Sequence, residues 1–118
     1  MAVSPGCISG IDAVIGRIRD ELDHLDLADN TLLILMGDNG YFLGERGYAG
    51  KWLPYEPSIR VPLLVYDPRP GSTRAGLRPT AMALNIDVAP TLLDLMNLKV
   101  PSEMTGTSLV TIERLQSA

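Results

Sequence analysis

The stretch Thr31-Leu32-Leu33-Ile34-Leu35-Met36-Gly37-Asp38-Asn39-Gly40 joins a short apolar run to a glycine-bounded turn with polar side chains. A continuous apolar run of this length, bounded by turn residues, is typical of a strand buried on both faces, as in a parallel sheet. Ligands of open α/β sheets bind at the carboxyl ends of the strands, which is where Asp38 and Asn39 stand. The stretch therefore predicts a buried strand that presents an acid and an amide to a ligand.

Amphipathic helices are predicted on both sides of this stretch. The first, from about Ser9 to Leu27 with Ser9 as N-cap, is indicated by apolar residues at steps of three and four: Ile8, Ile11, Ile15, Ile18, Leu22 and Leu25. The second, capped by Asn85 or Asp87, keeps helical spacing up to about Asn97 at Val88, Leu92, Leu95 and Met96. From Lys99 onward the signals are weak and predict irregular structure.

A second apolar run, Val61 to Tyr66, predicts a second strand, with Pro62 near its start, where proline is tolerated. Helix, strand, loop, strand and helix in this order predict an α/β fold with a parallel-type sheet flanked by amphipathic helices. The chain has 118 residues, of which 46% are hydrophobic and 20% charged, as expected of a globular chain. We expect residues 1–118 to form a single domain.

Composition excludes several function classes. A net charge of -4 argues against nucleic acid or an anionic membrane surface as partner. No segment approaches the roughly 20 apolar residues of a membrane span, and the first six residues lack the features of a signal peptide. Cys7 is the one cysteine, so no intrachain disulfide is expected. Nothing in the sequence brings Cys7 near His24 as a nucleophile-and-base pair.

The glycine-rich loop from Gly37 to Lys51 carries the candidate chemistry. Hard cations such as calcium prefer oxygen ligands, which Asp38 and Asn39 supply, but calcium takes six to eight oxygens, so two ligands alone are insufficient. Lys51, at the far end of the loop, suits an oxyanion as a compact point charge. Taken by spacing alone, a common Asp-Asn-Gly turn and a solvated lysine explain the same residues. Glu56 and Arg60 are expected to pair with each other or to anchor the loop.

Short motifs from about Ile8 to Leu109 together resemble the sulfatase family of the alkaline-phosphatase-like superfamily. They are Ile11-Asp12, Gly16-Arg17, Asp29-Asn30-Thr31, Gly37-Asp38-Asn39-Gly40, Leu43-Gly44-Glu45, Gly47, Gly50-Lys51, Tyr55-Glu56, Ser58-Ile59-Arg60-Val61-Pro62-Leu63, Asp87-Val88-Ala89-Pro90-Thr91-Leu92-Leu93 and Gly106-Thr107-Ser108-Leu109. Each motif is short, but their order and spacing are specific. The resemblance implies a partial alkaline-phosphatase-like fold.

The resemblance also implies a sulfuric ester hydrolase, as in arylsulfatases, in which Asp38 and Asn39 ligate Ca²⁺ and Lys51 contacts the sulfate of a sulfate ester. Family members use a formylglycine nucleophile, made from the cysteine or serine of a Cys/Ser-X-Pro/Ala-X-Arg motif. Cys7 is followed by Ile8-Ser9-Gly10-Ile11 and does not match it. Where many relatives carry a histidine after Gly-Glu, this chain has Arg46.

The resemblance therefore leads us to expect the C-terminal portion of a catalytic domain, with the nucleophile-bearing part absent, no catalytic residue in this chain, and no turnover by it alone. Two alternatives stay open. One is a phosphodiesterase or phosphonate hydrolase of the same superfamily. The other is a non-catalytic truncated interaction module that self-associates through an exposed strand edge and apolar helix faces. Relatives are often periplasmic, secreted or lysosomal, and the sequence leaves the compartment open.

Overall fold

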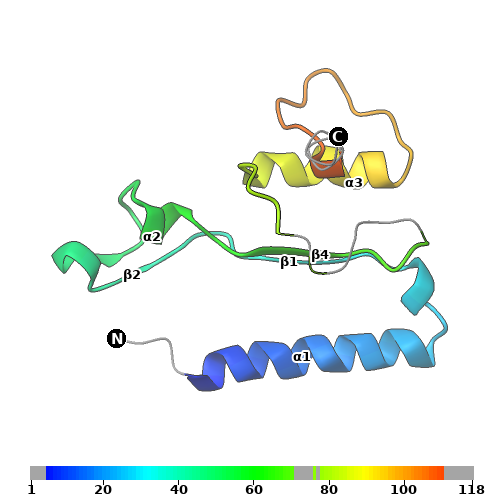
Figure 1. The fold of residues 1–118 in the computed structure, drawn as a ribbon, viewed down its shortest axis with the longest axis horizontal. Coiled ribbons are helices and arrows are strands. Elements are labelled where there is room, and N and C mark those ends of the chain that lie inside the picture. The colour runs from blue at the N-terminus through cyan, green and yellow to red at the C-terminus, as the bar shows by residue number, and fades with distance from the viewer. Residues whose placement is uncertain (1–4, 71–75, 77, 111–118) are drawn as a thin grey trace. The chain divides into compact units, whose positions relative to one another are not determined.

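The computed structural model describes residues 5–70, 76 and 78–110, and the chain divides into two compact units, Met1–Thr73 and Arg74–Ala118. The first unit contains α1 (Pro5–His24), η1 (Ala28–Asn30), β1 (Leu33–Met36), β2 (Phe42–Leu43), η2 (Glu45–Gly47), β3 (Ala49–Gly50), α2 (Glu56–Ile59) and β4 (Leu63–Tyr66) (Figure 1). The second contains η3 (Asn85–Asp87) and α3 (Val88–Leu95). Helices and strands are mixed, which confirms the α/β composition.

Helix α1 starts earlier than the sequence indicated. It begins at Pro5, so Ser9 lies inside the helix, and the prediction of Ser9 as N-cap is wrong. Proline suits the first turn of a helix because its missing N–H has no partner there. The helix ends at His24, and Asp26 follows with a left-handed backbone (φ +56°), which a helix cannot continue through.

Strands β1 and β4 lie side by side and pair antiparallel, with Leu33 opposite Tyr66 and Met36 opposite Leu63 (Figure 1). The prediction of a parallel-type sheet is therefore wrong for the described strands. The prediction of a buried strand is also wrong here, because no residue of β1 or β4 is buried and Leu35 and Leu64 are 37% and 56% exposed. An apolar run indicates a strand but not its direction or what covers it. Parallel neighbours need a long crossover, usually a helix, whereas residues 37–62 return the chain through a short hairpin and the four-residue helix α2.

The predicted glycine-rich loop is organised as a hairpin. Strands β2 and β3 pair antiparallel, with Phe42 opposite Gly50. The Phe42 side chain is 1% exposed and meets the rings of Tyr48 and Tyr55 edge-on, at centroid distances of 5.7 and 6.1 Å. This aromatic cluster gives the loop its own small core.

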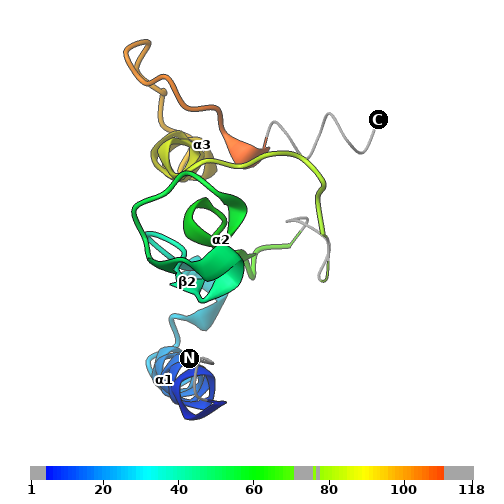
Figure 2. The same cartoon turned by 90° about the vertical axis from the view of Figure 1, so that its left-hand side faces the viewer.

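Helix α2 is attached to the start of the hairpin (Figure 2). The Gly40 N–H donates to the Ser58 carbonyl oxygen at 2.8 Å. A Cβ at Gly40 would clash with the Pro57 carbonyl oxygen, so only glycine fits this approach. The hydrogen bond fixes the turn that follows Asn39.

In the second unit, buried Asp87 connects segments that are distant in sequence through hydrogen bonds. Its Oδ2 accepts from the Leu84 N–H and its Oδ1 from the Thr107 N–H, both at 2.8 Å. The predicted capping residue is thus the N-cap of α3, but its carboxylate bonds outside that helix. Buried Thr91 completes the closure by accepting from the Leu109 N–H at 2.9 Å. Residues 99–108 form no helix or strand, as predicted, but residues 109–110 are helical, so the prediction of irregular structure from Lys99 onward is wrong there (Figure 1). The rest of that prediction, for residues 111–118, lies outside the described residues.

Candidate functional site

Asp38 and Asn39 stand directly after β1, at its carboxyl end, and both are exposed. The Gly37 N–H donates to the Pro62 carbonyl oxygen at 3.2 Å, which extends the contact between the two chain segments one residue beyond β1. The turn that carries both side chains therefore begins where the pairing with β4 stops. This placement is the one that the sequence predicted for them.

Asn39 connects the turn to the segment that carries Lys51. Its Nδ2 donates to the Gly40 carbonyl oxygen at 2.7 Å and to the Lys51 carbonyl oxygen at 3.4 Å. The amide nitrogen is thereby turned toward the hairpin, and Oδ1 accepts no hydrogen bond from the described residues. The backbone of Lys51 and the side chain of Asn39 thus meet, although 11 residues separate them in sequence.

The side-chain oxygens of Asp38 and Asn39 are of the type that a hard cation prefers, but two such residues are too few to bind one. Asp38 supplies a carboxylate and Asn39 an amide oxygen, the oxygen ligands that calcium prefers. Across the described ranges, no group of three or more His, Cys, Asp or Glu residues is placed to hold a metal ion. Calcium takes six to eight oxygens, so these two residues account for only part of a coordination shell.

Glu45 and Arg46 each contact another part of the hairpin region. The Glu45 carboxylate accepts from the Leu43 N–H at 2.6 Å. Hydrogen bonds from the backbone of Glu45 itself and then of Leu43 lower the pKa of this carboxyl below its ordinary value of 4.5. Arg46 has a left-handed backbone (φ +56°), and its guanidinium lies 5.3 Å from the centroid of the Tyr55 ring.

Sequence reasoning did not find the cluster of Phe42, Tyr48 and Tyr55. The available signal was that four of the chain's five Phe and Tyr residues lie in or just after the glycine-rich loop: Tyr41, Phe42, Tyr48 and Tyr55. Solvated loops carry few aromatic side chains, because burying such rings is favourable and exposing them is not. A loop with its own aromatic centre therefore indicated local packing.

The structure also places the two pairs of residues that the sequence analysis considered. Glu56 and Arg60 do pair, at 3.8 Å, but both side chains are exposed, and such a pair contributes little to stability. Cys7 and His24 lie near opposite ends of α1, roughly 25 Å apart at 1.5 Å of rise per residue. This separation along α1 does not bring the two side chains together.

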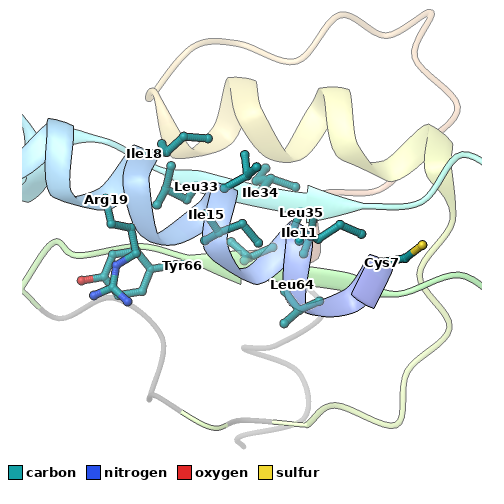
Figure 3. Close-up of a pocket in the computed structure, with 13 residues that line it drawn as sticks. Cys7, Ile11, Ile15, Ile18, Arg19, Leu33, Ile34, Leu35, Leu64 and Tyr66 are labelled. Carbon is teal, nitrogen blue, oxygen red and sulfur yellow. The ribbon is translucent and has the colours of Figure 1, made fainter. Parts of the chain in front are cut away.

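An apolar cavity of about 790 Å³ lies between α1 and the strands β1 and β4 (Figure 3). It is lined by Cys7, Gly10, Ile11, Val14, Ile15, Ile18, Arg19, Leu33, Ile34, Leu35, Leu64, Val65 and Tyr66. The Arg19 guanidinium lies 5.4 Å from the centroid of the Tyr66 ring, so the charge is directed at an aromatic face. Among the residues that the structure describes, no carboxylate or imidazole lines the cavity. It has the character of an unfilled core, not of a reaction site.

Known proteins match most of this chain. Residues 2–98 match the family model described as Sulfatase, whereas the predicted motif at 106–109 lies beyond that match. The N-acetylglucosamine-6-O-sulfatase of Bacteroides thetaiotaomicron is 37% identical over 102 residues, which are 86% of this chain and 18% of that protein. The arylsulfatase of Clostridium perfringens is 35% identical over 107 residues, which are 88% of this chain and 22% of that protein.

Solved structures match as well. One, of a protein in complex with its substrate D-glucosamine-2-N,6-O-disulfate, has a TM-score of 0.79 and 37% identity, covering 86% of this chain and 20% of the other. The phosphonate monoester hydrolase from Silicibacter pomeroyi has a TM-score of 0.76 and 31% identity, covering 84% of this chain and 19% of the other.

This chain therefore spans about a fifth of the length of the relatives that it matches. In the part of the chain that the structure describes, no helix combines the length and the apolar composition needed to cross a bilayer. The family model accounts for more than half of the residues, and several relatives exceed 30% identity. The chain belongs to the sulfatase family.

Proposed function

We propose that this chain forms part of the catalytic site of a sulfuric ester hydrolase, with Asp38 and Asn39 as calcium ligands and Lys51 as a sulfate contact. The observation that carries the proposal is the hydrogen bond from Asn39 Nδ2 to the Lys51 carbonyl oxygen. It ties the metal-binding turn to the segment that bears the cation. A divalent cation and an ammonium held side by side suit the oxyanion of a sulfate ester.

Each residue has a defined part in this site. Asn39 binds through Oδ1, because its amide nitrogen is already held by the carbonyl oxygens of Gly40 and Lys51. Asp38 contributes the negative charge that favours a cation, and Lys51 orients the sulfate and offsets its charge. A calcium ion bound there would polarise the sulfate oxygens and stabilise negative charge in the transition state.

None of Asp38, Asn39 and Lys51 would be the nucleophile of the reaction. No Cys/Ser-X-Pro/Ala-X-Arg motif occurs in the sequence, so a formylglycine would come from another part of the domain. This chain would be the C-terminal portion of an alkaline-phosphatase-like catalytic domain and would not turn over substrate by itself. Removal of the covalent catalyst is not compensated by the remaining binding groups.

A second candidate is a phosphonate or phosphate ester hydrolase. It is favoured by the 31% identity and the TM-score of 0.76 to a phosphonate monoester hydrolase. Sulfate and phosphonate monoesters both present tetrahedral oxyanions to a metal and a lysine, so the residues of this hairpin suit either. The substrate of the first solved structure, a disulfated glucosamine, favours sulfate esters.

The test begins with the source DNA upstream of the Met1 codon. We expect an in-frame Cys/Ser-X-Pro/Ala-X-Arg motif preceded by an acidic pair. The protein encoded by that longer frame would then be assayed with aryl sulfates, phosphate diesters and phosphonate monoesters. Higher kcat/KM for sulfate esters supports the first candidate, and higher kcat/KM for phosphonate or phosphate esters replaces it with the second.

Three variants of that longer protein test the residue roles. Asp38→Ala and Asn39→Ala should lower both calcium affinity and kcat/KM, whereas Lys51→Ala should lower kcat/KM by about 10²–10³ and leave calcium affinity unchanged. Arg60→Ala, which removes the exposed partner of Glu56, is the matched control and should change neither. The assignment fails if Lys51→Ala behaves like this control.

A further inference from the structure

Trp52 follows Lys51 directly and is 73% exposed. Tryptophan is highly buried on average in folded proteins, and among the aromatic side chains of the described residues Trp52 is the most exposed. It is the only tryptophan in the sequence. Its position relates it to the hairpin that carries the proposed sulfate site and not to the cavity under α1.

The indole is exposed but held in place. Its Nε1–H donates to the Ala49 carbonyl oxygen at 3.3 Å. The same edge of the ring packs against Gly50, where an added Cβ would lie 3.1 Å from Trp52 Cδ1 and 3.2 Å from Nε1. Gly50 has a left-handed backbone (φ +100°), which favours glycine at this position. One edge of the ring is thus fixed on β3 while most of its surface faces solvent.

A fixed aromatic face binds flat ligands at a small entropic cost, because few side-chain rotations are lost. The face of the indole carries partial negative charge and attracts the weakly positive C–H groups along one side of a pyranose ring. Lys51, the preceding residue, supplies the positive charge for a sulfate. A ligand that satisfies both residues carries a sulfate on a sugar ring.

We propose that Trp52 is a stacking platform for the sugar ring of a sulfated pyranose whose sulfate is bound at Lys51. The proposal rests on the sulfate-binding role of Lys51 proposed above and adds the substrate class. Trp52 then acts as a specificity-determining residue that favours sulfated sugars over small acyclic sulfate esters.

The test uses the full ¹⁵N-labelled chain with calcium and four probes: glucose 6-sulfate, glucose, methyl sulfate and inorganic sulfate. Two NMR signals are followed, the Lys51 backbone amide and the Trp52 indole N–H, which is the only indole N–H in the sequence. Glucose 6-sulfate should move both signals and bind about three- to tenfold more tightly than methyl sulfate. Inorganic sulfate and methyl sulfate should move the Lys51 signal and leave the indole signal in place.

Two variants separate stacking from folding. Trp52→Phe keeps an aromatic face and should retain part of the preference for glucose 6-sulfate, whereas Trp52→Ala should bind it no better than methyl sulfate. Circular dichroism checks that both variants fold. A Lys51 signal that responds while the indole stays unmoved by glucose 6-sulfate overturns the stacking role and leaves the sulfate site standing. If neither signal responds to any sulfate, both proposals fail, and an equal response to unsulfated glucose overturns the link to sulfate.

Discussion

Two regions of the first unit differ in packing. They are the hairpin region, residues 37–60, and the α1 region, which comprises residues 5–24, β1 and β4. The hairpin closes on its own Phe42, which is 1% exposed. In the α1 region, Ile11 and Ile18 remain 53% and 47% exposed, and a cavity of about 790 Å³ separates the helix from the strands. The hairpin region thus has a buried aromatic side chain of its own, although Tyr41, Trp52 and Ile59 stay 55%, 73% and 58% exposed, whereas no described side chain of α1, β1 or β4 is buried.

The two regions should differ most in the stability lost when one apolar side chain is removed from each. Phe42→Ala empties the centre of the aromatic cluster and should lower the free energy of unfolding by about 3–5 kcal/mol. Ile18→Ala, at a half-exposed position, should lower it by about 1 kcal/mol or less. Urea denaturation followed by circular dichroism gives both values. Equal losses would mean that the hairpin is no better packed than α1.

Glycine substitutions should have opposite signs in the two regions. Gly40→Ala drives a Cβ against the Pro57 carbonyl oxygen and should destabilise the protein by about 1–3 kcal/mol. Gly16→Ala lies in α1 with nothing within 4 Å of the added Cβ, and should stabilise by about 0.5–1 kcal/mol because alanine favours helix. Thermal unfolding measures both. A neutral Gly40→Ala would show that α2 is not fixed against the turn.

Self-association should depend on the α1 region alone. In the isolated chain we expect a second copy to cover the apolar surface that lines the cavity, because large exposed apolar surfaces favour association. Ile11→Lys places a charge on that lining and should weaken dimerisation about tenfold. Ile59→Lys, 58% exposed on α2 and outside the lining, is the control. Sedimentation equilibrium distinguishes them, and a wild-type chain that stays monomeric at all concentrations would contradict the prediction.

The smallest effect should be a pH dependence of local stability that is confined to the hairpin. The pKa of Glu45 is lowered in the folded state, so folding favours the carboxylate form. The contribution of this carboxylate to stability is therefore present above pH 4.5, the ordinary pKa of a glutamate side chain. That contribution is lost as the pH falls through the lowered folded pKa. The protection factor of the Leu43 amide, which compares its hydrogen exchange rate with that of an unprotected amide at the same pH, should fall in that acidic window because this amide is bonded to Glu45.

Glu45→Gln removes the titrating group and should abolish the pH-dependent fall in protection of the Leu43 amide. The amides inside α1, which make no contact with Glu45, serve as the reference. A Leu43 amide that exchanges with the same pH profile in the variant would show that another group controls the hairpin. The comparison between the two regions would then rest on packing alone.

The sequence by itself determined the features that depend on neighbouring residues. The stripe of apolar residues in α1, the two apolar runs that became β1 and β4, and the polar turn at Asp38 and Asn39 were all predicted. Helical and strand periodicity act over a few residues, and turn chemistry acts within four, so single-sequence patterns report them directly. The order of the short motifs indicated the sulfatase family in the same way, and the comparisons confirmed it. The residue roles and the single-domain assignment remain predictions.

The tertiary structure alone decided what joins distant residues. It set the antiparallel direction of β1 and β4, and it brought Asn39 to Lys51 and Thr107 to Asp87, across 12 and 20 positions. It also converted an apparently open loop into a hairpin centred on Phe42. Such contacts require loop closure, whose entropic penalty is offset by burial and hydrogen bonding at both ends, and no local pattern records which two ends will meet.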